Sequence, residues 1–335
     1  MAQPLVILCL AVLAGVVPTA IYVLVLWWCD RYEKEPAWLF TLAFLWGALP
    51  GTMLALLLEV GLALPLGGAA GPGELLQSST VGPLVEEGVK GAALLAIFLL
   101  YRREFDGVLD GIIYGGVVGF GFAMTENILY FLEPLARGGL GAFGLLWVMR
   151  ALIFGLNHAL FAAITGIGLG LARLARRSWQ RWLAPLAAFA AAVALHATHN
   201  LFAGLMQVSC WSVLGSLLSD WGGLSVVAAV LCLSWRQEQR WIHTHLASEV
   251  AGGVIGSEEY TALSSPWRRW GRDWETLSHA GWQAMRAGRR RAAWATELAF
   301  KKAQLAFGAP AAGEAAAIEK LRALLLAGRG HIDAP

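Results

Sequence analysis

The sequence predicts an all-α protein: a polytopic bundle of about seven transmembrane helices with a helical, basic cytoplasmic C-terminal tail. Of its 335 residues, 58% are hydrophobic and only 14% are charged, whereas a soluble domain carries roughly 25% charged residues. The mean hydropathy of +0.60 agrees. Residues 1–235 hold 11 Lys and Arg against 13 Asp and Glu, and residues 236–335 hold 14 against 10. This split predicts a membrane-embedded bundle over 1–235 and a basic amphipathic tail over 236–335.

Seven apolar segments are long enough to cross a bilayer, which takes about 20 residues. They are residues 5–28, 37–64, 80–101, 107–132, 143–172, 182–206 and 212–235. The first segment is too long for the apolar core of a signal peptide, so we expect a retained first helix. The third is the weakest candidate because it contains Glu86, Glu87 and Lys90. The alternative is eight spans, with a re-entrant element near residues 65–80.

The charges of the predicted loops set the orientation. The loops at 30–35, 102–106 and 173–181 carry eight Lys and Arg, whereas those at 65–79, 133–142 and 207–211 carry only Arg137. Basic loops face the cytoplasm. We therefore expect an extracytoplasmic N-terminus and a cytoplasmic C-terminus in the cell membrane.

Tryptophan and arginine are concentrated in the tail. Trp267, Trp270 and Trp274 follow one another at i, i+3 and i+7, beside Arg268, Arg269 and Arg272, and Arg286 and Arg289–Arg291 come next. A basic helix with Trp on its other side is typical of membrane-surface association, so we expect contact with anionic lipids. Nucleic-acid binding is the other interpretation of clustered Arg, and we do not favour it because the tail is tethered to a membrane. A short helical pair is expected over 293–307 and 314–327.

Ionisable and amide side chains recur inside four of the predicted spans. The third contains Glu86, Glu87 and Lys90, at spacings that let either carboxylate pair with the ammonium. The fourth span contains Glu126, with Phe122 on the same helix face, and the fifth contains Arg150 and His158. The sixth span contains His196 and Asn200 on one face. Such groups are costly in lipid and indicate a functional site. The carboxylates, His196 and Asn200 fall at compatible depths in the outer half of the bilayer, and His158 lies deeper.

These residues are sufficient for hydrolysis by an activated water. A carboxylate in an apolar site can act as a general base, and imidazole or amide groups can orient the water and stabilise the developing oxyanion. The same His and Glu side chains could ligate Zn²⁺, although the HExxH helix signature is absent. The sequence leaves open a metal-free site or a zinc site held by His158, His196 and Glu86.

Glycines spaced by four, as at Gly111, Gly115 and Gly119, predict close helix packing.

Several separated motifs resemble the PrsW-type intramembrane proteases, which belong with the CAAX-prenyl-protease and bacteriocin-processing membrane proteases. They are DRYEKEPAWLFTLAFLWGALP, EEGVK, FDGVLDGIIYGGVVGFGFAMTENILY, the stretch from Arg150 to His158, and HATHN. The resemblance covers about residues 18–235.

The resemblance assigns roles to matching positions. It implies that Glu86 or Glu87, with Lys90, forms the motif whose glutamate activates water, and that Phe122 and Glu126 match FxxxE. It further implies catalytic roles for His158 and for His196 and Asn200 of HxxxN, with His199 outside the set. It also implies a substrate anchored by a single span, such as an anti-sigma factor, cut near the outer face.

Two other functions fit the same residues. A proton-coupled transporter could use an intramembrane Glu and His relay, although no internal repeat is visible. A non-catalytic scaffold could use the polar groups only to pack its helices. Substrate, oligomeric state and the choice between Glu86 and Glu87 as base stay open at this point.

Overall fold

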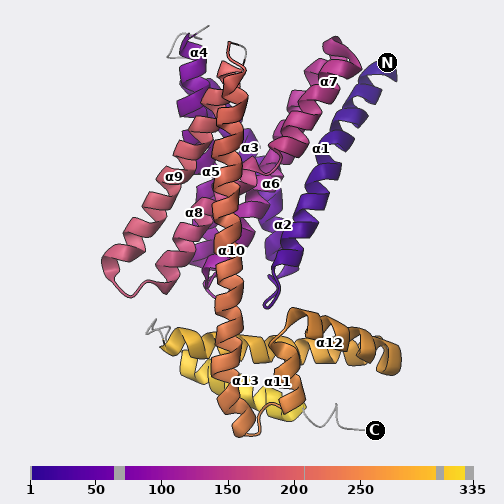
Figure 1. Cartoon of the computed structure of the whole chain (residues 1–335), viewed down its shortest axis with the longest axis vertical. Helices are drawn as coiled ribbons and strands as arrows, with labels where there is room; N and C mark the ends of the chain where they lie inside the picture. The colour runs from indigo at the N-terminus through magenta and orange to yellow at the C-terminus, as the bar shows by residue number, and fades with distance from the viewer. Residues whose placement is uncertain (1, 64–71, 207, 307–312, 329–335) are drawn as a thin grey trace. The chain divides into compact units, whose positions relative to one another are not determined.

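A computed structural model describes residues 2–63, 72–206, 208–306 and 313–328. In these residues all regular secondary structure is helical (Figure 1), which confirms the predicted all-α class. The chain divides into two compact units. Unit 1 comprises Met1–Cys29, Glu35–Arg173 and Arg177–Leu231, and unit 2 comprises Asp30–Lys34, Leu174–Arg176 and Cys232–Pro335.

Unit 1 contains the apolar helices. Helix α1 covers Ala2–Cys29, and α2 (Ala37–Trp46) continues through the π-helical turn η1 (Gly47–Gly51) into α3 (Thr52–Ala63). Helix α4 (Pro72–Leu76) and the π-helical turn η3 (Gln77–Val81) run directly into α5 (Gly82–Leu100), and α6 covers Val108–Glu133. The turn η4 (Pro134–Gly138), α7 (Gly139–Trp147) and η5 (Val148–Ile153) follow, then α8 (Asn157–Leu174), α9 (Ser178–Leu205) and α10 (Trp211–Ala251), whose second half belongs to unit 2.

Within the residues that the structure describes, six helical stretches are long and apolar enough to cross a membrane. They are Pro4–Cys29, Ala37–Leu62, Val108–Arg137, Gly139–Leu174, Ser178–Leu205 and Trp211–Ala251. The seventh predicted span is the helix α5, which is not among the six, and it holds the three charged residues Glu86, Glu87 and Lys90. The region of the predicted re-entrant element lies partly outside the described residues, and its described part, 72–81, continues as helix into α5.

Helix α6 is the centre of unit 1. In its span 78% of the most apolar stretch is buried, against no more than 33% in the other five spans. Both α1 and α2 pack on α6 (Figure 1). Glycines permit the close approach of α8: a β-carbon on Gly111 would lie 2.1 Å from the carbonyl oxygen of Gly166, and one on Gly119 would lie 2.2 Å from that of His158. Small residues at this spacing let helix backbones meet in lipid, as predicted.

The fifth span is broken in the middle. Helical structure ends at Ile153 and resumes at Asn157 with α8. The Tyr22 hydroxyl donates to the carbonyl oxygen of Ala151 at 2.7 Å and so satisfies a backbone group beside the break. Non-helical backbone at membrane depth is tolerated only where protein surrounds it. The break places His158 in the first turn of α8.

Unit 2 has a hydrophobic core of its own. Helices α11 (Ser257–Leu263), α12 (Pro266–Ala306) and α13 (Glu314–Ala327) pack with the end of α10. Tyr32, and Leu174 at the end of α8, join this core from the two short segments 30–34 and 174–176. Gly281, with φ of 81°, divides α12 into two helices. The second helix therefore begins at residue 282 rather than 293, and α13 begins where it was predicted.

Candidate functional site

Four of the predicted site residues form one buried cluster. Glu86 and Glu87 come from α5, His158 from α8 and His196 from α9. Each offers one ligand atom, and these atoms all lie within 4.8 Å of one another. The two glutamates and His196 are buried. Helix geometry brings Glu86 and Glu87 to the cluster as neighbours, whereas the two histidines reach it only because three separate helices pack together.

The Lys90 ammonium lies inside this cluster. It donates to Glu87 Oε1 at 2.8 Å and to Glu86 Oε2 at 3.2 Å, as the i,i+3 and i,i+4 spacings predict. Its Nζ also lies 2.9 Å from His158 Nδ1 and 4.1 Å from the centre of the Phe122 ring. A buried charge must be paired and hydrogen-bonded, and Lys90 meets this requirement through three groups of the site.

Each imidazole is held by a different carboxylate. His158 Nε2 lies 2.7 Å from Glu126 Oε2, and His196 Nδ1 lies 2.9 Å from Glu87 Oε1. Because an ionised carboxylate only accepts hydrogen bonds, the ring nitrogens that face Glu126 and Glu87 carry the protons. The other nitrogens, His158 Nδ1 and His196 Nε2, are then acceptors and lie 3.6 and 4.0 Å from Glu86 Oε2. The lone pair of His158 Nδ1 accepts from Lys90 at 2.9 Å.

Glu126 is itself held by Arg150. The guanidinium donates to Glu126 Oε2 at 2.8 Å and to Asn127 Oδ1 at 2.9 Å, and it stacks over the Tyr130 ring at 3.9 Å. Arg150 belongs to η5, just before the break in the fifth span. The arginine therefore fixes the carboxylate that in turn fixes His158.

Phe122 lies beside the cluster, whereas the Asn200 amide is hydrogen-bonded outside it. Phe122 is buried and lies 5.4 Å from the His158 ring, centre to centre, so it forms one wall of the site. The Asn200 amide donates to the backbone carbonyl of Ser78 at 2.8 Å. The structure thus records Asn200 joining α9 to η3 and gives it no hydrogen bond to the four clustered residues.

Two acidic residues of this region, Glu59 and Asp220, were not identified from the sequence. Glu59 of α3 is close enough to Glu126 and Lys90 to interact with their charges. A second polar cluster joins α8, α9 and α10: Asp220 Oδ2 lies 2.7 Å from His199 Nδ1 and accepts from Asn157 and Ser216 at 3.0 and 3.1 Å. Ionisable residues inside apolar runs, such as Glu59 and Asp220, are the signal that could have identified both.

The clustered residues suit a divalent metal in their chemistry. Two imidazole nitrogens and a carboxylate are the ligand set of many catalytic zinc sites, and the second nitrogen of each imidazole bonds a carboxylate, as is usual for metal-bound histidine. Glu87 Oε2 is buried and has no hydrogen-bond partner among the described residues. Glu86, His158 Nδ1 and His196 Nε2 would hold such an ion. The Lys90 ammonium bonds two of these three groups, so it would compete with a metal for their lone pairs.

A buried set of carboxylates and imidazoles inside an apolar helical bundle is typical of a membrane-embedded hydrolase. Residues 35–235 match the family model described as PrsW family intramembrane metalloprotease. This match spans more than half of the chain and includes every residue of the site. The chain therefore belongs to the PrsW family, and it is a multi-pass membrane protease.

Curated relatives agree with this assignment. The chain is 34% identical over 181 residues to a protein named protease PrsW from Geobacillus kaustophilus, covering 52% of this chain and 73% of the relative. It is 31% identical over 174 residues to protease PrsW of Bacillus subtilis, covering 51% and 72%. No solved structure matches the chain significantly.

Proposed function

We propose that this protease hydrolyses a peptide bond of a protein anchored by a single span, such as an anti-sigma factor, near the extracytoplasmic side of the membrane. In this proposal Glu86 is the general base that activates water, His196 orients that water, and His158 lines the site beside it. One observation carries the proposal: Glu86 Oε2 lies 3.6 Å from His158 Nδ1 and 4.0 Å from His196 Nε2, and the opposite nitrogen of each ring is held by another carboxylate.

Glu86 is better placed than Glu87 to act as the base. Glu87 Oε1 already accepts short hydrogen bonds from Lys90 and His196, and its side chain is fully buried. Glu86 Oε2 has longer contacts, and its side chain is 10% exposed. A general base must reach the proton it removes, directly or through one water. We therefore assign Glu87 to orienting His196.

We place the water between Glu86 Oε2 and His196 Nε2, which are 4.0 Å apart, because the Lys90 ammonium already bridges Glu86 Oε2 and His158 Nδ1. Polar atoms about 4 Å apart are too far for a direct hydrogen bond but are readily bridged by water. Glu86 would take the water proton during attack on the carbonyl carbon and would then return a proton to the leaving amine. If a zinc ion is bound, it supplies Lewis acidity and makes its bound water more acidic. In that case Glu86, His158 and His196 would hold the ion, and another carboxylate would transfer the proton. Exclusion of bulk water by the helical bundle is common to both cases.

We further propose that the N-terminus is extracytoplasmic and the C-terminus cytoplasmic. The basic loops on alternate sides of the spans support this orientation. It places Glu86 and Glu126 in the outer half of the bilayer, which agrees with cleavage near the outer face.

Cleavage in a defined system tests the base. The purified protein is reconstituted with a tagged single-span substrate, and the products are mapped by mass spectrometry. We expect Glu86→Gln to abolish cleavage, while Glu133→Gln, at the exposed end of α6, cleaves like the wild type. Wild-type rates from Glu86→Gln, or a cut in the cytoplasmic half of the substrate, would contradict the proposal.

The metal requirement is measured in the same sample. Metal content per chain is determined, and cleavage is followed before and after a chelator. One zinc per chain, with activity lost on chelation and restored by zinc, would make Glu86, His158 and His196 ligands and would assign the proton transfer to another carboxylate. Full activity in metal-free protein would support Glu86 as the base.

A further inference from the structure

We propose that the first half of α12, residues 266–280, together with Trp282, binds the anionic phospholipid surface of the bilayer in which unit 1 is embedded. We call this segment the interfacial helix. The proposal concerns the tail alone and does not depend on how the active site hydrolyses its substrate. Its occupant is a lipid surface, and four observations within unit 2 support it.

The interfacial helix contributes nothing to the core of unit 2. None of the side chains of residues 266–280 is buried, whereas ten side chains of the second half of α12 are. Trp267, Trp270 and Trp274 are 65%, 58% and 55% exposed, and Trp282 is 58% exposed. An exposed apolar patch on a folded domain marks an interaction surface, and tryptophan is enriched where membrane meets water.

The interfacial helix contacts the short segment that follows the first span. The Arg269 guanidinium donates to the backbone carbonyl of Tyr32 at 2.9 Å. Tyr32 lies three residues after Cys29, the last residue of the first span, and three residues extend at most about 11 Å. The residue that accepts from Arg269 is therefore joined to the end of the first span by a very short connection.

The charge of this region is complementary to anionic headgroups. Arg268 and Arg272 lie on the interfacial helix, and Arg286 and Arg290 follow it in the second half of α12. None of the four forms a salt bridge among the described residues. Two neighbouring arginines do form salt bridges: Arg289 pairs with Asp273 at 2.7 Å, and the buried Arg291 pairs with Glu259 at 2.8 Å. Each arginine near an anionic membrane strengthens association by roughly five-fold, so four unpaired arginines make anionic lipid the favoured partner.

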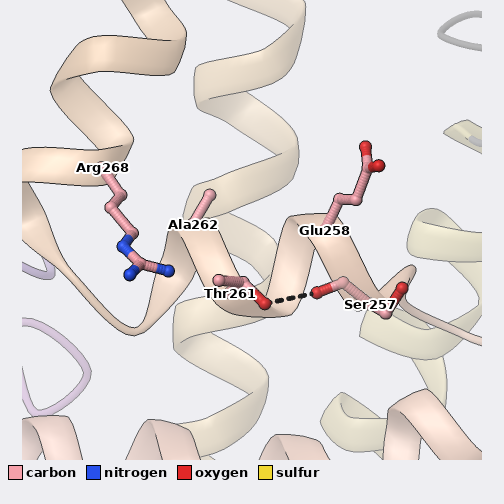
Figure 2. A pocket seen from close by; sticks show the side chains of 5 residues that line it. All are labelled: Ser257, Glu258, Thr261, Ala262 and Arg268. Atoms are coloured by element: carbon pink, nitrogen blue, oxygen red, sulfur yellow. Dashed lines mark hydrogen bonds between the residues drawn. The ribbon is translucent and has the colours of Figure 1, made fainter.

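A surface pocket lies at the start of the interfacial helix. Ser257, Glu258, Thr261 and Ala262 of α11 line it, together with Arg268 from α12, and its volume is about 330 Å³. Figure 2 shows the Arg268 guanidinium directed toward Thr261, with the Glu258 carboxylate directed away from it. A guanidinium matches phosphate geometry, so a lipid phosphate is the group that we expect Arg268 to bind here.

Hydrogen exchange of the full-length protein tests the proposal. The protein is placed in nanodiscs of phosphatidylcholine alone or of phosphatidylcholine with phosphatidylglycerol, and exchange is followed by mass spectrometry. We expect amides of residues 266–282 to exchange more slowly in the anionic discs. Peptides from α13, which lies in the unit 2 core, should exchange equally in both.

Matched variants separate the contributions of charge and tryptophan. Arg268→Gln with Arg272→Gln should reduce the protection of residues 266–282 on anionic discs by roughly 25-fold, at five-fold per arginine. Trp270→Ala with Trp274→Ala should reduce it on both lipid compositions. Lys320→Gln and Leu326→Ala, which change exposed residues of α13, should change nothing and serve as controls.

Three outcomes would overturn the proposal. Exchange of residues 266–282 that is identical in neutral and anionic discs would exclude anionic lipid as the partner. Protection that survives both double variants would mean that protein contacts, not lipid, protect the segment. A third outcome would assign the surface to nucleic acid instead. In that outcome a labelled DNA duplex binds to the discs, the binding is lost in the arginine variant, and the lipid composition does not change the exchange of residues 266–282.

Discussion

The contact between Gly119 and His158 predicts that a single methyl group on α6 will disable the active site. A β-carbon added at Gly119 would lie 2.2 Å from the carbonyl oxygen of His158, 2.5 Å from its carbonyl carbon and 2.6 Å from the α-carbon of Ala159. All three atoms are backbone, so no side-chain rotation can relieve the clash. Gly119→Ala must therefore move α8 away from α6 near His158.

The size of this displacement follows from the distances. Ordinary van der Waals contact of a β-carbon begins at 3.4 Å, so the backbone of His158 must retreat by 3.4 less 2.2, or 1.2 Å. His158 Nε2 and Glu126 Oε2 are 2.7 Å apart, and a shift of this size would break their hydrogen bond. Misplacing a catalytic group by 1 Å can reduce the rate on the order of 100-fold, and overpacking costs about 1–3 kcal/mol of stability.

Cleavage and thermal unfolding of reconstituted protein measure the two effects. We expect Gly119→Ala to lower kcat on the order of 100-fold with little change in KM, while the protein stays folded. The matched control is Gly88→Ala, because Gly88 lies next to Glu87 on α5 and a β-carbon there meets nothing within 4 Å. A Gly119→Ala protein that cleaves at the wild-type rate would refute the argument that this contact positions His158.

Three further substitutions have expected outcomes. Lys90→Met removes the cation that Glu86 and Glu87 share, so the unfolding free energy should fall by about 3–5 kcal/mol, as for other broken buried pairs; unchanged thermal unfolding in detergent would contradict this. Arg150→Met frees Glu126, so kcat should fall while KM is kept; a change in KM alone would argue for a role in substrate binding. Arg291→Met removes the partner of Glu259 in unit 2, so hydrogen exchange of the tail core should accelerate while cleavage continues; slow exchange in that core would count against a structural role for Arg291.

The sequence predicted the membrane helices and most of the site because both depend on composition. Long apolar segments cannot be buried in so small a soluble protein, so they indicate spans. Glu86, Lys90, Glu126 and His158 stand out because ionisable groups are costly inside such segments. The pairing of Lys90 with both glutamates follows from helix geometry alone. The ion pair between Arg150 and Glu126 joins the only arginine of the predicted span 143–172 to a carboxylate of the preceding span.

Features that depend on the rotation and interruption of helices were not predictable. The break before Asn157 contains Gly155 but no proline, and glycine is so frequent in the apolar runs of this chain that it does not mark a break by itself. The spacing of HATHN puts His196 and Asn200 on one side of α9, yet Asn200 bonds the Ser78 carbonyl instead of joining the cluster. Arg291 belongs to a run of arginines typical of a solvated surface, but its side chain is buried against Glu259 and the carbonyl of Leu325.

The charge balance of the site explains why Glu86 can accept a proton. Glu86, Glu87 and Glu126 place three negative charges in the site and Glu59 adds another nearby, whereas Lys90 and Arg150 supply two positive ones, so negative charge is in excess when both histidines are neutral. Uncompensated charge in an apolar interior is costly, and uptake of a proton reduces it. Glu87 and Glu126 each accept at least two hydrogen bonds from charged or imidazole groups, which stabilises their ionised forms. The proton taken from water is therefore expected to go to Glu86, whose contacts are the longest of the three carboxylates.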